Sequence, residues 1–459
     1  MTSLPVGALT DDPDVLAAYA SDRASFCPSG RPSALVRARS VQDVVDTLKW
    51  AYDNRVPVVP QGARTGLSGG ANAVDGCVLL NLEKMDRIVE IDVPEQIAVV
   101  QPGVINADLA AAVAEKGLYY PPDPGSRDIS SIGGNVATNA GGMCCLKYGV
   151  TGDFVRALQV VLADGQVTRT GRRTAKGVAG YDLTRLFVGS EGTLGVVTEV
   201  TVALRPAAAR PLTAVAFFDS AADAGRAVAD YLGAGYRPAV LELMDRTSID
   251  AVGKLQDLGF PADVGAVLIA QSDVGAEATE ELKAYERSAR ACGATEVIVA
   301  DDPAEGDLLM RGRRLAGLAF EEYPACLVED VCVPRGRLAD LIEGVERIAA
   351  EHDVLIACVG HAGDGNVHPT VLFDLDQAEA AERAFDAVMR LGLDLGGTIT
   401  GEHGVGLLKR EWLAEELDDA ALWTHQQIKM ALDPRGILNP GRVIDSVPGG
   451  RADADRRSS

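Results

Sequence analysis

The sequence predicts an α+β fold with two main domains, and three observations lead to that prediction. Between residues 56 and 200, short runs rich in β-branched residues alternate with glycine loops, and no repeating βαβ unit is evident. Prolines then bracket a short linker of small and polar residues at 205–211. Beyond it, strands alternate with helices of a dozen or more residues, which predicts a second sheet with helices packed on one face. A chain of 459 residues is long enough for two or three cores.

The elements of the first domain follow from capping residues and from periodicity. Asp12 and Pro13 are a cap and a first-turn proline, which indicates a helix start. Ser40 precedes residues 41–54, whose apolar side chains recur at helical spacing. Strands are expected at 56–59, 78–82, 98–100, 158–162 and 194–204, with one helix at 107–116.

The second domain is predicted from the same kinds of pattern. Strands are expected at 213–218, 240–244, 266–270, 326–333 and 354–359. Residues 412–443 read as a helix followed by a turn rich in proline and glycine. The chain is therefore divided into 1–206, 207–411 and 412–445, and the small and charged residues 446–459 are predicted to form a disordered tail.

Composition excludes several classes of partner. The formal net charge is −23, which repels nucleic acid and anionic lipid, so no nucleic-acid partner is expected. No run approaches the ~20 apolar residues that span a bilayer, and we find no secretory signal. The eight cysteines show no C-x-x-C spacing, which argues against a zinc–thiolate site, an iron–sulfur cluster or a disulfide framework. A reduced cytoplasmic protein is predicted, and peripheral contact with the inner face of a membrane is left open.

Three glycine-rich loops of the first domain are candidates for holding a phosphate-bearing cofactor. They lie at 60–71, 131–142 and 189–195. Successive glycines let backbone N–H groups turn inward as an anion-binding nest, and loops without bulk let the backbone approach a flat ligand. A tight turn explains any single loop equally well, but three in one domain favour a large nucleotide cofactor. No G-x-G-x-x-G follows a strand, so a Rossmann dinucleotide site is disfavoured.

The histidines form a second candidate site. Asp364-Gly365 between extended runs is a strong hairpin signal, and with these two as the turn, His361 pairs with His368. Both imidazoles then share one face with Asn366, within metal-bridging distance of each other. The remaining pairs of this predicted register are Gly363 with Asn366 and Ala362 with Val367.

The segment Gly401-Glu402-His403-Gly404 adds two further candidates to this site. Two histidines and the Glu402 carboxylate make a set of three ligands that leaves coordination positions open for substrate, and His403 is then free to act as a base. The alternative, that each histidine is a hydrogen-bonded structural residue, is favoured for one histidine alone but not for this group. His352 and His425 are given no role.

Taken together, these motifs resemble the FAD-linked oxidase family, which includes D-lactate dehydrogenases, the glycolate oxidase flavoprotein subunit and D-2-hydroxyglutarate dehydrogenase. The resemblance covers nearly the whole chain. It rests on the loops and histidine motifs above and on the segments 121–126, 147–149, 180–183 and 438–442. It implies an FAD-binding domain of the vanillyl-alcohol-oxidase type at 1–206. It also implies a substrate cap domain with an antiparallel sheet and a metal site at 207–411, and a segment at 412–445 that returns to the FAD domain.

The resemblance also implies roles for individual residues. The two first loops would surround the pyrophosphate and ribose of FAD, and the third would lie beside the isoalloxazine. The residues implied to bind FAD are Pro60, Gly62, Arg64, Thr65, Gly66, Ser68, Gly69, Gly70, Pro124, Ser126, Gly133, Gly134, Asn135, Asn139, Gly141, Gly142, Tyr148, Gly149, Glu191, Gly192, Val197 and Asn439. FAD is expected to be bound non-covalently. Some relatives attach FAD through a histidine, but here every histidine lies at or beyond position 352, outside the predicted flavin domain. A link through Cys144 or Cys145 is left open, although small buried residues are favoured there.

In the hydroxyglutarate and lactate branches of the family, the residues matching His361, His368 and Glu402 hold a divalent metal, for which zinc or manganese is expected. The residue matching His403 is the base, the one matching Asn366 touches substrate, and Arg313 matches an arginine that binds the substrate carboxylate. The threonine and lysine anchors of the hydroxyglutarate branch are replaced by Gly317 and Val328. The substrate is therefore expected to be a small D-2-hydroxy acid without a distal acid group, either D-lactate or glycolate.

Alternative functions differ in what they require of the two sites. D-2-hydroxyglutarate dehydrogenase remains the nearest alternative. A metal-dependent hydrolase would use the histidines but not the glycine loops, and a non-catalytic electron carrier would use the loops but not the histidines. The enzyme would need a separate electron acceptor: a quinone, a cytochrome, an iron–sulfur subunit or an electron-transfer flavoprotein. A homodimer is left open.

Overall fold

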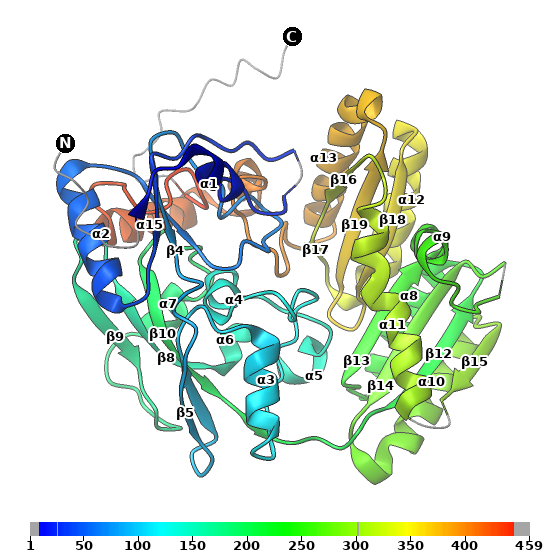
Figure 1. The fold of residues 1–459 in the computed structure, drawn as a ribbon. Coiled ribbons are helices and arrows are strands. Elements are labelled where there is room, and N and C mark those ends of the chain that lie inside the picture. The colour runs from blue at the N-terminus through cyan, green and yellow to red at the C-terminus, as the bar shows by residue number, and fades with distance from the viewer. Residues whose placement is uncertain (1–8, 25, 262, 301–302, 445–459) are drawn as a thin grey trace.

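The structure, a computed structural model, describes residues 9–24, 26–261, 263–300 and 303–444. Two bodies of mixed helix and sheet stand side by side (Figure 1). The blue-to-green body contains the N-terminal half of the chain, and the green-to-orange body contains an eight-stranded sheet. The predicted disordered tail at 446–459 lies outside the described residues.

The first body contains two sheets. The smaller sheet has the order β1-β2-β4-β3, in which β2, β4 and β3 are parallel. Its strands are β1 (Leu9–Thr10), β2 (Ala34–Arg37), β4 (Val78–Asn81) and β3 (Val58–Gln61). The larger sheet is antiparallel, with the order β5-β6-β10-β8-β9. Its strands are β5 (Ile88–Asp92), β6 (Ile97–Val100), β10 (Val196–Ala203), β8 (Val155–Val161) and β9 (Val167–Gly171).

Helices cover these sheets where the sequence has an apolar face. Helix α2 (Val41–Asn54) has the predicted bounds, and a capping box between Ser40 and Asp43 fixes its start. Its apolar stripe is buried against the smaller sheet. The other helices of this body are α1 (Pro13–Ala18), α3 (Asn106–Ala114), α4 (Ile132–Thr138), α5 (Cys145–Tyr148), α6 (Thr151–Phe154) and α7 (Leu183–Phe187).

The second body is built on one antiparallel sheet of eight strands. Seven follow the order β15-β12-β14-β13-β18-β19-β16, and β17 also pairs with β19. The strands are β12 (Leu212–Phe218), β13 (Val240–Asp245), β14 (Ala266–Ser272), β15 (Glu296–Val299), β16 (Ala325–Val328), β17 (Val331–Cys332), β18 (Leu355–His361) and β19 (Asn366–Phe373). A two-stranded ribbon of β7 (Leu118–Tyr119) and β11 (Arg205–Pro206) joins the linker to the first body.

Helices pack on both faces of this sheet, so the prediction of helices on one face is wrong. Helices α8 (Ala221–Gly233), α10 (Ala278–Ala291), α12 (Leu338–His352) and α13 (Ala378–Asp394) cover one face. Helices α9 (Arg246–Leu255) and α11 (Pro303–Phe320) cover the other. The physical reason lies in the strands: Ala214, Ala216 and Phe218 face one core while Val215 and Phe217 face the other. Because both faces are apolar, both need a cover.

The C-terminal segment crosses back to the first body. After the short helix α14 (Leu413–Glu416), helix α15 (Asp419–Leu432), drawn in red in Figure 1, returns to the first body, where Ile428 and Leu432 pack against the core of the larger sheet. Ile437 and Leu438 join the core under α2, and Leu438 forms a parallel bridge with Val58. The buried Lys429 donates to the carbonyls of Thr193 and Leu438. The C-terminal segment therefore completes the first body.

Candidate active site

A cavity of about 1180 Å³ lies between the two bodies. The three glycine loops form its wall on the side of the first body, together with Pro124 and Ser126. Helix α11, strands β16, β18 and β19, and the pair Glu402 and His403 form the wall on the other side. Loops and histidines that are far apart in the sequence thus line one space, whose size suits a large ligand.

The glycines of the loops are required where side chains would collide. A Cβ at Gly62 would lie 2.4 Å from Ser131 Oγ, and one at Gly133 would lie 2.5 Å from Pro102 Cβ. The first two loops therefore pack directly against each other, which only glycine permits. Ser131 Oγ also accepts the N–H of Gly134 and caps α4. This arrangement gives the cavity a wall of backbone, which suits a flat dinucleotide such as FAD.

Most of the residues predicted to bind FAD line the cavity. They are Pro60, Gly62, Arg64, Thr65, Gly66, Ser68, Gly70, Pro124, Ser126, Gly133, Gly134, Asn135, Glu191, Gly192 and Val197. Arg64 also lines the cavity, but its guanidinium already has partners. Nη1 donates to the carbonyl of Ala18, and the guanidinium lies 4.0 Å from the centre of the Tyr19 ring. A direct pair between Arg64 and a phosphate would need that contact to break.

The remaining predicted residues do not line this cavity. Asn439 Nδ2 donates to the carbonyls of Gly70 and Glu191, so it joins the first loop to the third. Asn139 ends α4 in the left-handed conformation and accepts the N–H of Gly152. Two others face the second body: a Cβ at Gly141 would lie 2.5 Å from Glu402 Oε2, and the Tyr148 hydroxyl donates to Asp273. The rest of this group are Gly69, Gly142 and Gly149.

The histidine hairpin has a different register from the predicted one. His361 pairs with Asn366, and His368 pairs with Val359, because the turn contains the four residues 362–365 rather than two. Asp364 N–H bonds back to the His361 carbonyl, and Gly365 takes a φ of 77°, as in a four-residue loop built around a tight turn. The predicted pairs of Gly363 with Asn366 and of Ala362 with Val367 are therefore wrong.

The two imidazoles nevertheless meet, because the register shifts by two residues and side chains alternate with a period of two. Their ring centres are 5.2 Å apart. Glu402 Oε1 lies 3.0 Å from His361 Nε2 and 3.3 Å from His368 Nε2. His403 stacks on His368 at 4.7 Å, with its Nε2 3.9 Å from the same carboxylate oxygen. The four predicted side chains therefore form one cluster.

Two buried carboxylates lie behind His361 and His368. Glu242 Oε1 is 2.7 Å from His361 Nδ1, and Asp330 Oδ1 is 3.4 Å from His368 Nδ1, the latter with poor hydrogen-bond alignment. Carboxylates that hold the far nitrogen of an imidazole are typical of metal-binding histidines. Asp330, His368, Glu402 and His403 also form a group whose candidate ligand atoms lie within 4.8 Å of one another. The donor set of His361, His368 and Glu402 thus fits a divalent ion, with Asp330 and Glu242 supporting it.

Burial and charge set the protonation of these imidazoles in opposite directions. Burial lowers the pKa of His403 to about 4, against the upward pull of Asp330. His403 is therefore neutral at pH 7 and can accept a proton. Burial would also lower the pKa of His361, but the charges of Glu242 and Glu402 outweigh it and raise that pKa well above its ordinary value. In the ion-free cluster a proton on His361 compensates the carboxylates, and a metal ion would take its place.

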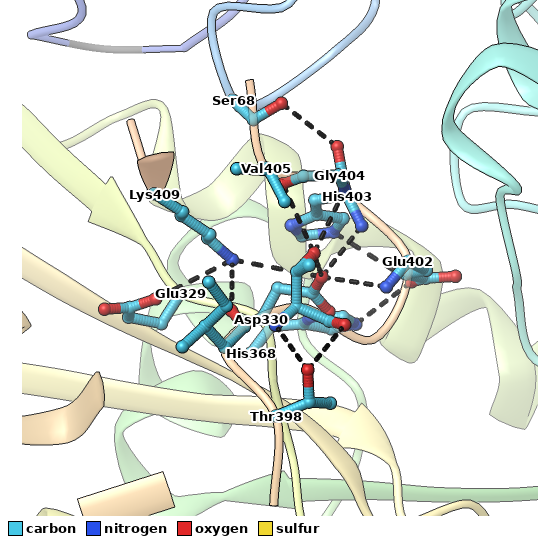
Figure 2. A network of polar contacts seen from close by, with 12 residues as sticks. Ser68, Glu329, Asp330, His368, Thr398, Glu402, His403, Gly404, Val405 and Lys409 are labelled. Carbon is cyan, nitrogen blue, oxygen red and sulfur yellow. Dashed lines mark hydrogen bonds and ion pairs between the residues drawn. The ribbon is translucent and has the colours of Figure 1, made fainter. Parts of the chain in front are cut away.

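Asp330 organises the segment that carries Glu402 and His403, as Figure 2 shows. Its Oδ2 accepts the Thr400 hydroxyl at 2.7 Å and the backbone N–H groups of Glu402 and His403 at 2.8 and 2.7 Å. Lys409 Nζ lies 3.9 Å from Asp330 and 3.8 Å from Glu329, and donates to the carbonyl of Ile399. The backbone of Glu402 and His403 is thus fixed by one buried carboxylate.

The comparisons with known proteins match both parts of the chain. The family described as "FAD binding domain" matches residues 32–171, and "FAD linked oxidases, C-terminal domain" matches residues 208–443. The chain belongs to the FAD-linked oxidase family. The fold, the enzyme class and the FAD cofactor predicted from the sequence are confirmed, and this member of the family is an FAD-dependent oxidoreductase.

Relatives of this FAD-linked oxidase match along most of their length. Glycolate oxidase subunit GlcD of Bacillus subtilis (strain 168) is 41% identical over 430 residues, covering 93% of this chain and 92% of that protein. The subunit of the same name from Escherichia coli (strain K12) is 39% identical, covering 91% and 84%. D-lactate dehydrogenase of Anaerostipes hadrus is 36% identical, covering 93% and 92%.

Solved structures with low sequence identity share the fold. p-Cresol methylhydroxylase with substrate bound has a TM-score of 0.78 at 18% identity, covering 96% of this chain and 94% of that one. 4-Ethylphenol oxidase from Gulosibacter chungangensis has a TM-score of 0.77 at 20% identity, covering 95% and 94%. They support the predicted vanillyl-alcohol-oxidase type of architecture. Within the described residues of this FAD-linked oxidase, no helix has the length and apolar character needed to cross a bilayer.

Arg313 and Asn366 differ in where they lie relative to the cavity. Arg313 lines the cavity from α11, and its Nε is 2.7 Å from Glu242 Oε2. Asn366, predicted to touch substrate, does not line the cavity. Its Nδ2 donates to Asp330 Oδ1 at 2.9 Å.

Sequence reasoning missed Glu242, Asp330 and Lys409 as members of this site. A signal for the first was present, because Glu242 is the one charged residue in the apolar run 240–244 of a predicted strand. A second signal was the acidic pair Glu329 and Asp330 inside the predicted strand 326–333. Buried charges need partners, so such residues mark a polar site. Lys409 carries no comparable signal, since it follows a loop.

Proposed function

We propose that this protein oxidises a small D-2-hydroxy acid, D-lactate or glycolate, to the corresponding 2-oxo acid. The observation that carries the proposal is the cavity wall opposite the glycine loops. There, an imidazole with a pKa of about 4, a set of two histidines and a carboxylate, and Arg313 face one space. Relatives named glycolate oxidase subunit and D-lactate dehydrogenase support the same reaction class.

The residues divide the chemistry among themselves. FAD would supply the acceptor for the C2 hydride, and a divalent ion at His361, His368 and Glu402, zinc or manganese, would supply a Lewis acid. Arg313 binds the substrate carboxylate through the guanidinium nitrogens that Glu242 leaves free. His403 takes the hydroxyl proton, because it is neutral and adjoins the ligand cluster.

The cavity wall near Arg313 favours a monocarboxylate. Gly317 and Val328 stand where the hydroxyglutarate branch of the family carries its threonine and lysine, and both line the cavity. Leu327 and Val359 add apolar surface to the same wall. A substrate with a distal carboxylate would have to place that charge against an apolar surface, at a cost of about 2 kcal/mol or more when it is unpaired.

We infer in addition that electrons leave the protein to a separate acceptor. The eight cysteines lack the spacing of an iron–sulfur site, so this chain has no evident second redox centre of that kind. One relative, from Arabidopsis thaliana, is named "D-lactate dehydrogenase [cytochrome], mitochondrial", and two others are named as subunits. A cytochrome, a quinone, an iron–sulfur subunit or an electron-transfer flavoprotein would each satisfy this requirement.

The proposal is tested by mixing the purified protein anaerobically with D-lactate, L-lactate, glycolate and D-2-hydroxyglutarate. The flavin band, expected at roughly 450 nm, should bleach with D-lactate or glycolate and not with L-lactate. Bleaching mainly by D-2-hydroxyglutarate would overturn the substrate and retain the reaction class. A yellow protein that none of the four bleaches would overturn the function.

A further inference from the structure

We propose that Glu242 is a positioning residue that couples the substrate-binding arginine to a metal-ligand histidine. The inference rests on the proposed function and deepens it. One carboxylate makes both contacts: Oε1 is hydrogen-bonded to His361 Nδ1 at 2.7 Å, and Oε2 forms an ion pair with Arg313 Nε at 2.7 Å, without hydrogen-bond alignment. The two partners come from different elements, the end of β18 and the middle of α11.

The position of Glu242 in the fold makes a purely structural role a poor explanation. It lies in β13, in the interior of the eight-stranded sheet, and its side chain has no exposed surface. Its neighbours Leu241, Leu243 and Met244 are buried apolar residues of the two cores. A buried charge in such a strand is costly, and an apolar residue would pack there without that cost. The contacts of Glu242 with the active site explain why a carboxylate is present.

The contact with His361 determines which ring nitrogen faces the cluster. With Nδ1–H donated to Glu242, it is Nε2 that faces the cluster, 3.0 Å from Glu402 Oε1, and a metal ion that displaces the Nε2 proton meets a lone pair there. The opposite tautomer would leave no lone pair on Nε2 for a metal ion. Glu242 therefore selects the ligating form of His361.

The contact with Arg313 holds the guanidinium from behind. Arginine has donors and no acceptors, so its Nε can be held by the carboxylate while the terminal nitrogens remain for an anion in the cavity. The side chain of Arg313 is 11% exposed, which leaves one edge accessible to the cavity. Both partners meet on the carboxylate of Glu242. Glu242 therefore sets the distance between Arg313, which binds the substrate carboxylate, and the metal ligand His361.

Replacing the carboxylate by an amide should break this coupling. In Glu242→Gln a single oxygen remains, and Arg313 can use only an oxygen, so the amide NH₂ is left facing His361 Nδ1. The imidazole must then accept at Nδ1 and carry its proton on Nε2. We expect the dissociation constant for Mn²⁺ or Zn²⁺ to rise about 10- to 100-fold. We expect KM for D-lactate at saturating metal to rise about tenfold, with kcat changing less than KM.

Glu281→Gln is the matched control. Glu281 is a second buried carboxylate of the same body, and it accepts the Ser272 hydroxyl in the core, away from the cavity. This variant should bind metal and D-lactate as the wild type does, because only the packing of the body is disturbed. Glu242→Asp covers the case in which the glutamine variant does not fold. It keeps the charge, but being one methylene shorter it should reach one partner only, so either metal affinity or KM should change by tenfold or more.

The metal titration and the turnover assay separate the two ways of failing. Wild-type protein that no hydroxy acid reduces would refute the proposed function, while the metal titration would still decide whether Glu242 acts on His361. Wild-type metal affinity and KM in both Glu242 variants would overturn the inference and leave the proposed function standing. A shift of the same size in Glu281→Gln would also overturn it, because any buried carboxylate would then have the effect.

Discussion

Replacing Asp330 by asparagine tests how the segment around His403 is held. The Oδ2 of Asp330 accepts three bonds of 2.7 to 2.8 Å, from the Thr400 hydroxyl and from the backbone of Glu402 and His403. A bond to a charged acceptor contributes about 1.5–3 kcal/mol, and one to a neutral oxygen about 1 kcal/mol. If the amide oxygen of the asparagine takes the place of Oδ2, the free energy of unfolding should fall by about 1 kcal/mol per bond, or about 3 kcal/mol in all.

The variant is expected to fold, because about 3 kcal/mol is less than the total stability of a typical domain. The new amide nitrogen would replace Oδ1, which now accepts from Asn366. Asn366 has an unpaired Oδ1 and can turn its amide to accept instead. His368 Nδ1, which lies 3.4 Å from Asp330 Oδ1, would face the new amide nitrogen, and no similar rotation gives it an acceptor. Metal affinity should therefore fall about 10- to 100-fold.

Two measurements on Asp330→Asn check this. The melting temperature of the holoprotein should fall by roughly 6–12 °C, at about 2–4 °C per kcal/mol for a domain of this size. The metal dissociation constant should rise in a direct titration. Asp245→Asn is the control, because Asp245 caps α9 by accepting the Ser248 N–H and should lose stability without weakening metal binding. A variant that melts and binds metal like the wild type would refute the role given to Asp330.

Three further predictions concern the base and the metal. In His403→Ala the rate of flavin reduction should fall about 10²- to 10⁴-fold while FAD stays bound, because Asp330 and Ser68 hold only the backbone of this residue; an unchanged rate would refute its role as base. Since the active base must be unprotonated, the wild-type reduction rate should hold from pH 8 to pH 5 and fall only as pH nears the His403 pKa of about 4; an acid limb near pH 6.5 would contradict it. Dialysis against a chelator should remove activity and leave the flavin absorbance, because metal and FAD are held by separate residues; zinc or manganese should restore the rate, and full activity after proven metal loss would exclude the ion.

Sequence patterns predicted those parts of the fold that depend on local periodicity. Helix α2 has the predicted bounds because its cap, its apolar stripe and its length agree. The short helices α4 to α7 carry no such stripe and were missed, since they are only four to seven residues long, and α4 forms within a glycine loop. The helices on the second face of the eight-stranded sheet were missed for a different reason. A strand that is apolar on both faces has no alternation to show how many layers cover it.

The part of the site that the sequence predicted consists of residues that lie in short motifs. The clustering of His361, His368 and Glu402 was expected from two motifs, although the hairpin register was wrong by two residues. A shift of one residue would have separated the histidines onto opposite faces, so the even shift kept the prediction of their proximity intact. Glu242 and Asp330 lie 119 and 38 residues before the histidines they contact. No spacing rule connects such positions, and only the pairing of β13 with β18 and of β16 and β17 with β19 brings them together.

His403, the proposed base, belongs to the second body, yet its position is set by the first and third glycine loops of the first body. Ser68 donates to the carbonyl of His403 and accepts the N–H groups of Leu407 and Leu408, and Glu191 accepts those of Val405 and Gly406. Burial raises the pKa of Glu191 to about 7, so this carboxylate stays in the interface at an electrostatic cost that its two backbone donors offset only in part. Hydride and proton must leave one carbon–oxygen unit in one geometry, which requires the base to be placed relative to the flavin loops more than to its own sheet. Backbone contacts from two flavin loops meet that requirement and leave the His403 side chain free for chemistry.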